Sequence, residues 1–141
     1  MKSIHVLLVE DNEGDILLTR EALEEGKLVN KISIARDGKE AIDFLEGNNH
    51  FQSSTLPDLI LLDVNLPKKN GHEVLHYIKT ADAFRHIPVI MLTTSSSFND
   101  INSSYLNHAN CYITKPVEVE EFFRVVLQLE NFWVNVVKLP T

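Results

Sequence analysis

Residues 59–71 read LILLDVNLPKKNG, and this stretch decides how the rest of the chain is interpreted. Four apolar residues lead directly to Asp63, and a loop that contains Pro67 and ends near Gly71 follows. A continuously hydrophobic run of this length is typical of a strand that is covered on both faces of a parallel sheet. In open α/β folds, ligands bind beyond the carboxyl ends of such strands. The stretch therefore predicts a buried strand that ends in a functional carboxylate.

Similar apolar runs recur along the chain and alternate with segments of helical spacing. The predicted strands are Ile4–Val9, Ile32–Ala35, Leu59–Leu62, Val89–Leu92 and Cys111–Ile113. Between them, apolar residues recur three and four positions apart, which predicts amphipathic helices. Asn12 and Ser97 are each followed three residues later by an aspartate, a pattern typical of helix N-termini. Strands that alternate with helices predict a doubly wound, five-stranded parallel α/β sheet with right-handed crossovers.

The composition limits the classes of function. The chain has 141 residues, of which 44% are hydrophobic and 23% charged, as in an ordinary single globular domain. The net charge of -7 and the lack of a Lys/Arg block argue against a nucleic-acid partner. Cys111 is the single cysteine, so no disulfide within the chain is expected. Because the sequence also shows no signal-peptide pattern and no membrane-length apolar run, we expect a cytoplasmic domain without a membrane partner.

Polar residues follow four of the five predicted strands. They are Glu10, Asp11, Asp63, Thr93, Thr94 and Lys115. Carboxylates that meet at one sheet edge repel each other unless a cation is present, and oxygen ligands suit Mg²⁺. A carboxylate at this edge could then act as a nucleophile towards phosphorus and become an aspartyl phosphate. The alternative is that these acids are unrelated and lie near helix N-termini because the helix dipole favours them there.

Four motifs resemble those of the response-regulator receiver family over residues 4 to about 130. They are LVEDN, LLDVNLPKKNG, LTTS and YITKP. The resemblance implies a flavodoxin-like (βα)5 fold with strand order 2-1-3-4-5. It also implies that Asp63 is the phosphoacceptor, that Asp11 and Asp63 are direct Mg²⁺ ligands, and that Mn²⁺ or Ca²⁺ can substitute in vitro. Glu10 would act through metal-bound water, and Asn65 would offer its backbone carbonyl to the metal.

The same resemblance assigns roles to residues at the ends of the fourth and fifth strands. It implies that Thr93 and Lys115 bind the phosphoryl group and that Tyr112 is the aromatic switch residue. It also implies a cis peptide bond between Lys115 and Pro116, a state confined essentially to X–Pro bonds.

A narrower resemblance concerns the stretches EDNEGD, LTTSSSFNDI, ANCYITKPV and FWVNVVKLP. They look like those of response regulators that serve bacterial phytochrome kinases, notably cyanobacterial ones. This resemblance implies a regulatory phosphoprotein, not an enzyme for an outside substrate, that assists its own phosphotransfer and dephosphorylation. Its donor would be a sensor histidine kinase, a phytochrome, and its readout would be contact with a downstream protein. Two alternatives remain: a scaffold that binds without phosphorylation, and a phosphatase acting on an outside substrate.

The end of the chain is unusually apolar for a solvated terminus. We divide the chain into a receiver domain, residues 1–130, and a C-terminal extension, residues 131–141. Phe132, Trp133, Val136 and Val137 in this extension either cover the domain's own core or form the interface of a symmetric homodimer. The resemblance favours the dimer, formed together with the fourth-helix and fifth-strand face.

Residues 72–76 read HEVLH, which matches the zinc-binding pattern H-E-x-x-H. A catalytic zinc site needs a third protein ligand, and no recognisable partner follows in the sequence. We therefore interpret His72 and His76 as solvated histidines on the surface of a helix.

Overall fold

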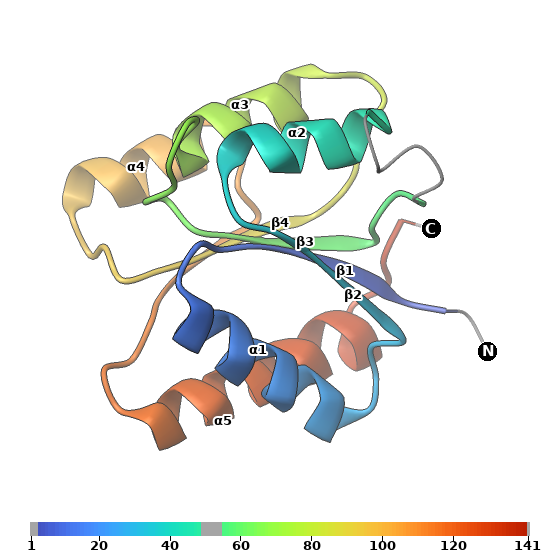
Figure 1. The fold of residues 1–141 in the computed structure, drawn as a ribbon, viewed down its shortest axis with the longest axis vertical. Coiled ribbons are helices and arrows are strands. Elements are labelled where there is room, and N and C mark those ends of the chain that lie inside the picture. Colours follow the sequence, from blue (N-terminus) through green and yellow to red (C-terminus); the bar gives the residue numbers. More distant parts are fainter. Residues whose placement is uncertain (1–2, 49–54, 141) are drawn as a thin grey trace.

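The computed structural model of the chain describes residues 3–48 and 55–140, and its centre is a five-stranded parallel sheet (Figure 1). The strands are β1 (His5–Val9), β2 (Lys31–Ala35), β3 (Leu59–Leu62), β4 (Val89–Thr93) and β5 (Cys111–Thr114). Their order is β2-β1-β3-β4-β5, and every neighbouring pair is parallel. The predicted fold class and strand order are therefore confirmed.

Helices cover both faces of the sheet (Figure 1). On one face lie α1 (Glu13–Gly26) and α5 (Val119–Glu130). On the other lie α2 (Gly38–Glu46), α3 (Gly71–Thr80) and α4 (Phe98–Leu106). A π-helical segment, η2 (Asn131–Val136), continues α5 without a break. No helix that the structure describes is long and apolar enough to cross a membrane.

The predicted helix starts are observed. The Asn12 side chain accepts a hydrogen bond from the Asp15 backbone N–H at 2.9 Å, and α1 begins at Glu13, directly after Asn12. The Ser97 side chain accepts one from the Asp100 backbone N–H at 3.1 Å and caps α4. Each cap satisfies a backbone donor that has no partner within the first turn of a helix.

The strands are hydrophobic throughout because successive side chains enter two different cores. Leu7 and Val9 of β1 pack in the cluster that contains residues of α2 and α3. Val6 and Leu8 pack in the cluster that contains residues of α1 and α5. Because helices cover both faces of the sheet, neither set of alternating positions along a strand faces solvent, where polar residues would be favoured. The uninterrupted apolar runs in the sequence follow from this two-sided burial.

The C-terminal extension packs partly on the domain's own core. Trp133 is half-buried and packs against the cluster between the sheet, α1 and α5. Phe132 and Val136 remain 51% and 58% exposed. The extension therefore covers part of the core and also leaves apolar side chains at the surface.

The start of α3 lies directly against the backbone that follows β3. The Gly71 backbone N–H donates to the Val64 carbonyl at 2.8 Å. A Cβ atom at Gly71 would lie only 2.1 Å from the Asp63 carbonyl oxygen and 2.6 Å from the Val64 Cα. The absence of a side chain at residue 71 thus lets the helix approach the backbone of Asp63.

We predict that Gly71→Ala destabilises the protein by about 1–3 kcal/mol, because the added methyl group forces the backbone apart. The free energy of unfolding in urea measures this. Gly14→Ala is the control, since its Cβ would meet only the Asn12 side-chain oxygen within 4 Å, at 3.2 Å, and should cost less. Equal stability of Gly71→Ala and the wild type would contradict the packing described for α3.

Candidate functional site

The backbone pairing of the sheet continues past the strand ends and brings the predicted site residues together. The Asp63 N–H donates to the Val9 carbonyl at 3.1 Å, which ties the residue after β3 to the end of β1. The Lys115 N–H donates to the Thr93 carbonyl at 2.7 Å, which ties the residue after β5 to the end of β4. The site residues are thus held by backbone hydrogen bonds that extend the sheet.

Three carboxylates converge at this edge. Glu10, Asp11 and Asp63 each offer one oxygen, and these atoms all lie within 4.8 Å of one another. Glu10 and Asp63 are buried, whereas Asp11 is exposed to solvent. Hard oxygen donors of this kind suit Mg²⁺ and Mn²⁺. The acidic donor set predicted for a divalent cation is therefore present, and its Asp11 member is open to solvent.

The buried ammonium of Lys115 lies among the carboxylates. Its Nζ donates to Glu10 Oε1, to Asp63 Oδ2 at 3.2 Å and to Asp15 Oδ2 at 3.0 Å. Burial alone would lower the pKa of Lys115, but the Glu10 hydrogen bond and attraction to Asp63 hold it above its ordinary value. Burial raises the pKa of Glu10 to about 7, although Lys115 opposes this shift. Lys115 thus remains a cation inside the site.

Both oxygens of Asp63 have partners. Oδ1 accepts from the Asn65 backbone N–H at 3.2 Å, and Oδ2 accepts from Lys115. The first contact bends the loop after β3 back towards the carboxylate, which places the backbone of Asn65 beside it. These two hydrogen bonds hold the Asp63 carboxylate from two sides.

Thr93 and Tyr112 are connected through Ser95. Thr93 is fully buried, and its hydroxyl oxygen accepts from the Ser95 backbone N–H at 3.4 Å. The Tyr112 hydroxyl donates to the Ser95 carbonyl at 2.8 Å. The predicted hydroxyl and the predicted aromatic switch residue therefore contact the same residue of the β4–α4 loop.

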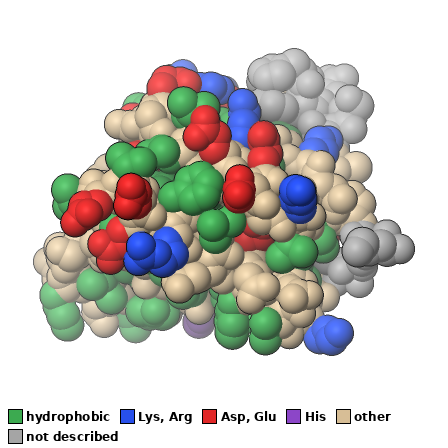
Figure 2. Space-filling view, turned by 90° about the horizontal axis from the view of Figure 1, so that it is seen from below, with side chains coloured by type: hydrophobic (Ala, Val, Ile, Leu, Met, Phe, Trp, Pro, Cys, Tyr) green, Lys and Arg blue, Asp and Glu red, His purple; other side chains and the backbone are tan. Residues whose placement is uncertain are grey.

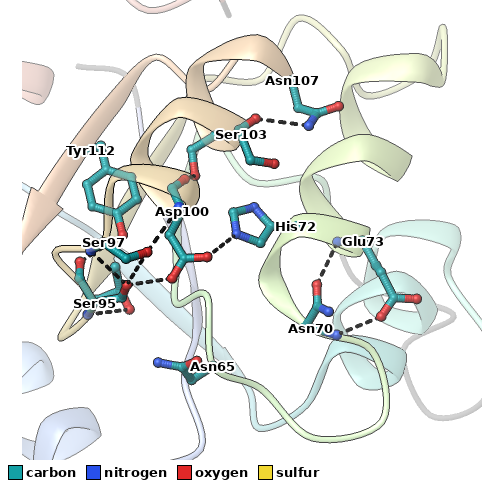
Figure 3. A network of polar contacts seen from close by, with 12 residues as sticks. Asn65, Asn70, His72, Glu73, Ser95, Ser97, Asp100, Ser103, Asn107 and Tyr112 are labelled. Atoms are coloured by element: carbon teal, nitrogen blue, oxygen red, sulfur yellow. Dashed lines mark hydrogen bonds and ion pairs between the residues drawn. The ribbon is translucent and has the colours of Figure 1, made fainter.

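A polar network extends from this loop to α3 (Figure 3). The Ser95 hydroxyl donates to the Asp100 carboxylate, and His72 Nε2 lies 2.8 Å from Asp100 Oδ1. These two hydrogen bonds hold the pKa of Asp100 below its ordinary value. Because Asp100 is in the first turn of α4, the network links the loop, α4 and α3.

The network corrects our interpretation of the HEVLH motif. His72 is partly buried and paired with Asp100, so it is not simply solvated. His76 is exposed, and its Nδ1 lies 3.3 Å from Asn107 Oδ1. Among the residues that the structure describes, the motif does not contribute to any converging group of three metal ligands.

The expectation of a cis peptide bond between Lys115 and Pro116 is wrong for this structure. No cis peptide bond occurs in residues 3–48 and 55–140, so the bond between Lys115 and Pro116 is trans. X–Pro bonds prefer the trans isomer by about 0.5–1 kcal/mol, and Lys115 reaches the carboxylates in that form.

Two contacts of this region were not predicted from the sequence. Asp15 was recognised only as a helix-start residue, and its contact with Lys115 joins residues 100 positions apart. The pairing of His72 with Asp100 joins residues 28 positions apart, and no local pattern indicates it.

The fold and the site together define a receiver domain. Residues 6–127 match the family model described as the response regulator receiver domain. The chain belongs to the response regulator receiver family.

Similar proteins include several response regulators, one of which is described as a phytochrome response regulator. The response regulator Rcp1 of Synechocystis sp. is 43% identical over 135 residues, which cover 96% of this chain and 92% of Rcp1. The crystal structure of the phosphorylated cyanobacterial phytochrome response regulator RcpA matches with a TM-score of 0.96 and 42% identity, covering 99% of this chain and 100% of that one. The Mn²⁺-bound form of Rcp1 matches with a TM-score of 0.94 and 42% identity, covering 98% and 99%.

We predict that Lys115→Met lowers the free energy of unfolding by about 3–5 kcal/mol in the presence of a chelator, because buried carboxylates lose their cation. Added Mg²⁺ should restore part of this loss. Urea unfolding with chelator and with Mg²⁺ measures both effects.

Lys39→Met is the matched control, since the Lys39 side chain is 61% exposed in its pair with Asp43 and its loss should cost less than about 0.5 kcal/mol. Wild-type stability of Lys115→Met in chelator would show that the ammonium does not stabilise the site.

Proposed function

We propose that the protein works as a single-domain response regulator that is switched by phosphorylation of Asp63. The proposal rests on one observation: Asp63 lies beside the Glu10 and Asp11 carboxylates and accepts a hydrogen bond from the buried Lys115 ammonium. This combination offers a nucleophile, ligands for a cation and a fixed positive charge at one place. Phosphoryl transfer needs mainly such positioning and charge neutralisation.

The proposed donor is a phosphohistidine of a sensor histidine kinase. A carboxylate oxygen of Asp63 attacks the phosphorus, the phosphorus–nitrogen bond breaks, and its electron pair returns to the imidazole. Mg²⁺ held by Asp11, Asp63, the Asn65 carbonyl and, through water, Glu10 would neutralise charge on the transferred group. Lys115 pairs with the phosphoryl oxygens.

The switch is proposed to run through Thr93 and Tyr112. Phosphorylation adds negative charge and acceptor oxygens beside Thr93, whose hydroxyl turns towards them. Because Ser95 contacts both Thr93 and Tyr112, this shift reaches the Tyr112 hydroxyl and the surface formed by α4 and β5. A local change in charge thus changes a surface that a downstream protein reads.

The proposed kinase is a phytochrome in the cytoplasm. RcpA supports this, since its structure is that of a phosphorylated phytochrome response regulator and aligns with 99% of this chain and 100% of its own. The Mn²⁺-bound form of Rcp1 supports the proposed use of a divalent cation.

We predict that Asp63→Asn abolishes labelling by a phosphorylated phytochrome kinase, and by acetyl phosphate with Mg²⁺, because the amide cannot act as the nucleophile. Radiolabel retained on the protein measures this. Asp82→Asn removes an exposed carboxylate that lies two residues after the end of α3 and should label like the wild type.

Stoichiometric labelling of Asp63→Asn would exclude Asp63 as the acceptor. A wild type that takes no label and binds no Mg²⁺ would instead indicate a scaffold that works without phosphorylation. Labelling by other kinases but not by phytochromes would exclude only the proposed donor.

The C-terminal extension is proposed to form a homodimer. Phe132 and Trp133 line a cavity of about 340 Å³ together with Cys111 and Ile113 of β5 and Leu129 of α5. Beside it, apolar side chains of the extension remain exposed. The α1 and α5 side of the molecule, in Figure 2, shows hydrophobic side chains interspersed with acidic ones. An apolar surface next to an edge strand suits a symmetric interface between two copies.

We predict that Phe132→Ser with Val136→Ser converts the dimer to a monomer, because both exposed anchors are removed while the core contacts of Trp133 stay. Sedimentation velocity measures the oligomeric state. Leu17→Ser, which removes an exposed apolar residue of α1, is the control and should leave the dimer intact. A monomeric wild type with and without beryllofluoride would exclude the dimer.

A further inference from the structure

The hydrogen-bonding capacity of Lys115 is completely used in this structure. An ammonium group has three N–H donors. Lys115 Nζ has three acceptors, which are Glu10 Oε1, Asp63 Oδ2 at 3.2 Å and Asp15 Oδ2 at 3.0 Å. A further acceptor, such as an oxygen of a phosphoryl group on Asp63, can therefore bond to Lys115 only if one of the three is released.

Asp15 is the partner of Lys115 that is most easily released. Its side chain is 26% exposed, against 3% for Glu10 and 8% for Asp63, so water can replace the lost contact. Release of a buried carboxylate would leave its charge without a partner, which is far more costly. Asp15 also lies outside the group of converging carboxylates that suits a cation.

The backbone of Asp15 is held at the start of α1, within reach of Lys115. Its N–H donates to the Asn12 side chain at 2.9 Å, in the N-cap of α1. Asp15 lies in the first turn of α1, and its carboxylate reaches Lys115 Nζ at 3.0 Å. The carboxylate therefore starts from a backbone position that lets it reach Lys115.

We propose that Asp15 is a positioning residue that holds Lys115 in the unphosphorylated protein and competes with the phosphoryl group for it. This rests on the proposed function of Asp63. In the unphosphorylated state, Asp15 shares the ammonium with Glu10 and Asp63. When the phosphoryl group arrives, Lys115 exchanges Asp15 for a phosphoryl oxygen, and the Asp15 carboxylate turns to solvent. The negative charge of Asp15 therefore makes the phosphorylated state less favourable than it would be without that charge.

The test uses Asp15→Asn, whose amide oxygen can still accept from Lys115 but carries no charge. With saturating Mg²⁺, we expect beryllofluoride to bind about three- to tenfold more tightly than to the wild type, as for the loss of one partly exposed like charge. Calorimetric titration measures the affinity. The gain should shrink as salt is raised, since Asp15 is partly exposed and its field is screened.

Two variants separate competition from general effects. Glu13→Gln removes a charge from the same turn of α1, but Glu13 is exposed and pairs with Arg36. The affinity of this variant for beryllofluoride should therefore stay at the wild-type value. Asp15→Glu keeps the charge and should remain close to the wild type. Unfolding in urea verifies that each variant is folded.

Equal affinity of Asp15→Asn and the wild type would overturn the inference, and so would weaker binding or a gain that does not depend on salt. In those cases the proposed function stands, because the wild type still takes beryllofluoride. A wild type that binds Mg²⁺ but no beryllofluoride would overturn both.

Discussion

The buried ammonium of Lys115 is the interaction on which the site depends. Two carboxylates, of Glu10 and Asp63, are buried beside it, and unpaired charges in such a place would cost several kcal/mol each. One ammonium cannot neutralise all the acids that meet here. The excess negative charge is what makes the edge of the sheet attractive to a divalent cation, and the fixed positive charge is what makes it suitable for a phosphoryl group.

These charges can be held close together only because the sheet beneath them is rigid and apolar. Side chains of the central strands alternate between two buried clusters, and backbone hydrogen bonds continue past the strand ends to Asp63 and Lys115. Close contact between α3 and the backbone of Asp63, through Gly71, fixes the loop from the other side. The hydrophobic framework therefore determines the positions of groups that would otherwise repel each other.

Two polar systems meet at the β4–α4 loop. The charge cluster around Lys115 lies next to Thr93, which is bonded to Ser95. Ser95 in turn contacts Tyr112 and the Asp100–His72 pair, so the loop is joined to β5, α4 and α3 (Figure 3). In the switch that we propose, a change of charge in the first system alters the contacts of the second. This arrangement provides a physical route from the site to the α4 and β5 surface.

The sequence by itself determined the strands, their parallel arrangement and the acidic edge, since apolar runs and the residues directly after them are local features. It also determined the helix start at Asn12, because a cap depends on a spacing of three residues. Only the tertiary structure decided that Asp15 reaches Lys115, a contact across 100 residues, and that His72 pairs with Asp100. It likewise decided which apolar side chains of the extension are covered. Such contacts depend on how whole elements pack, and no periodicity along the chain encodes them.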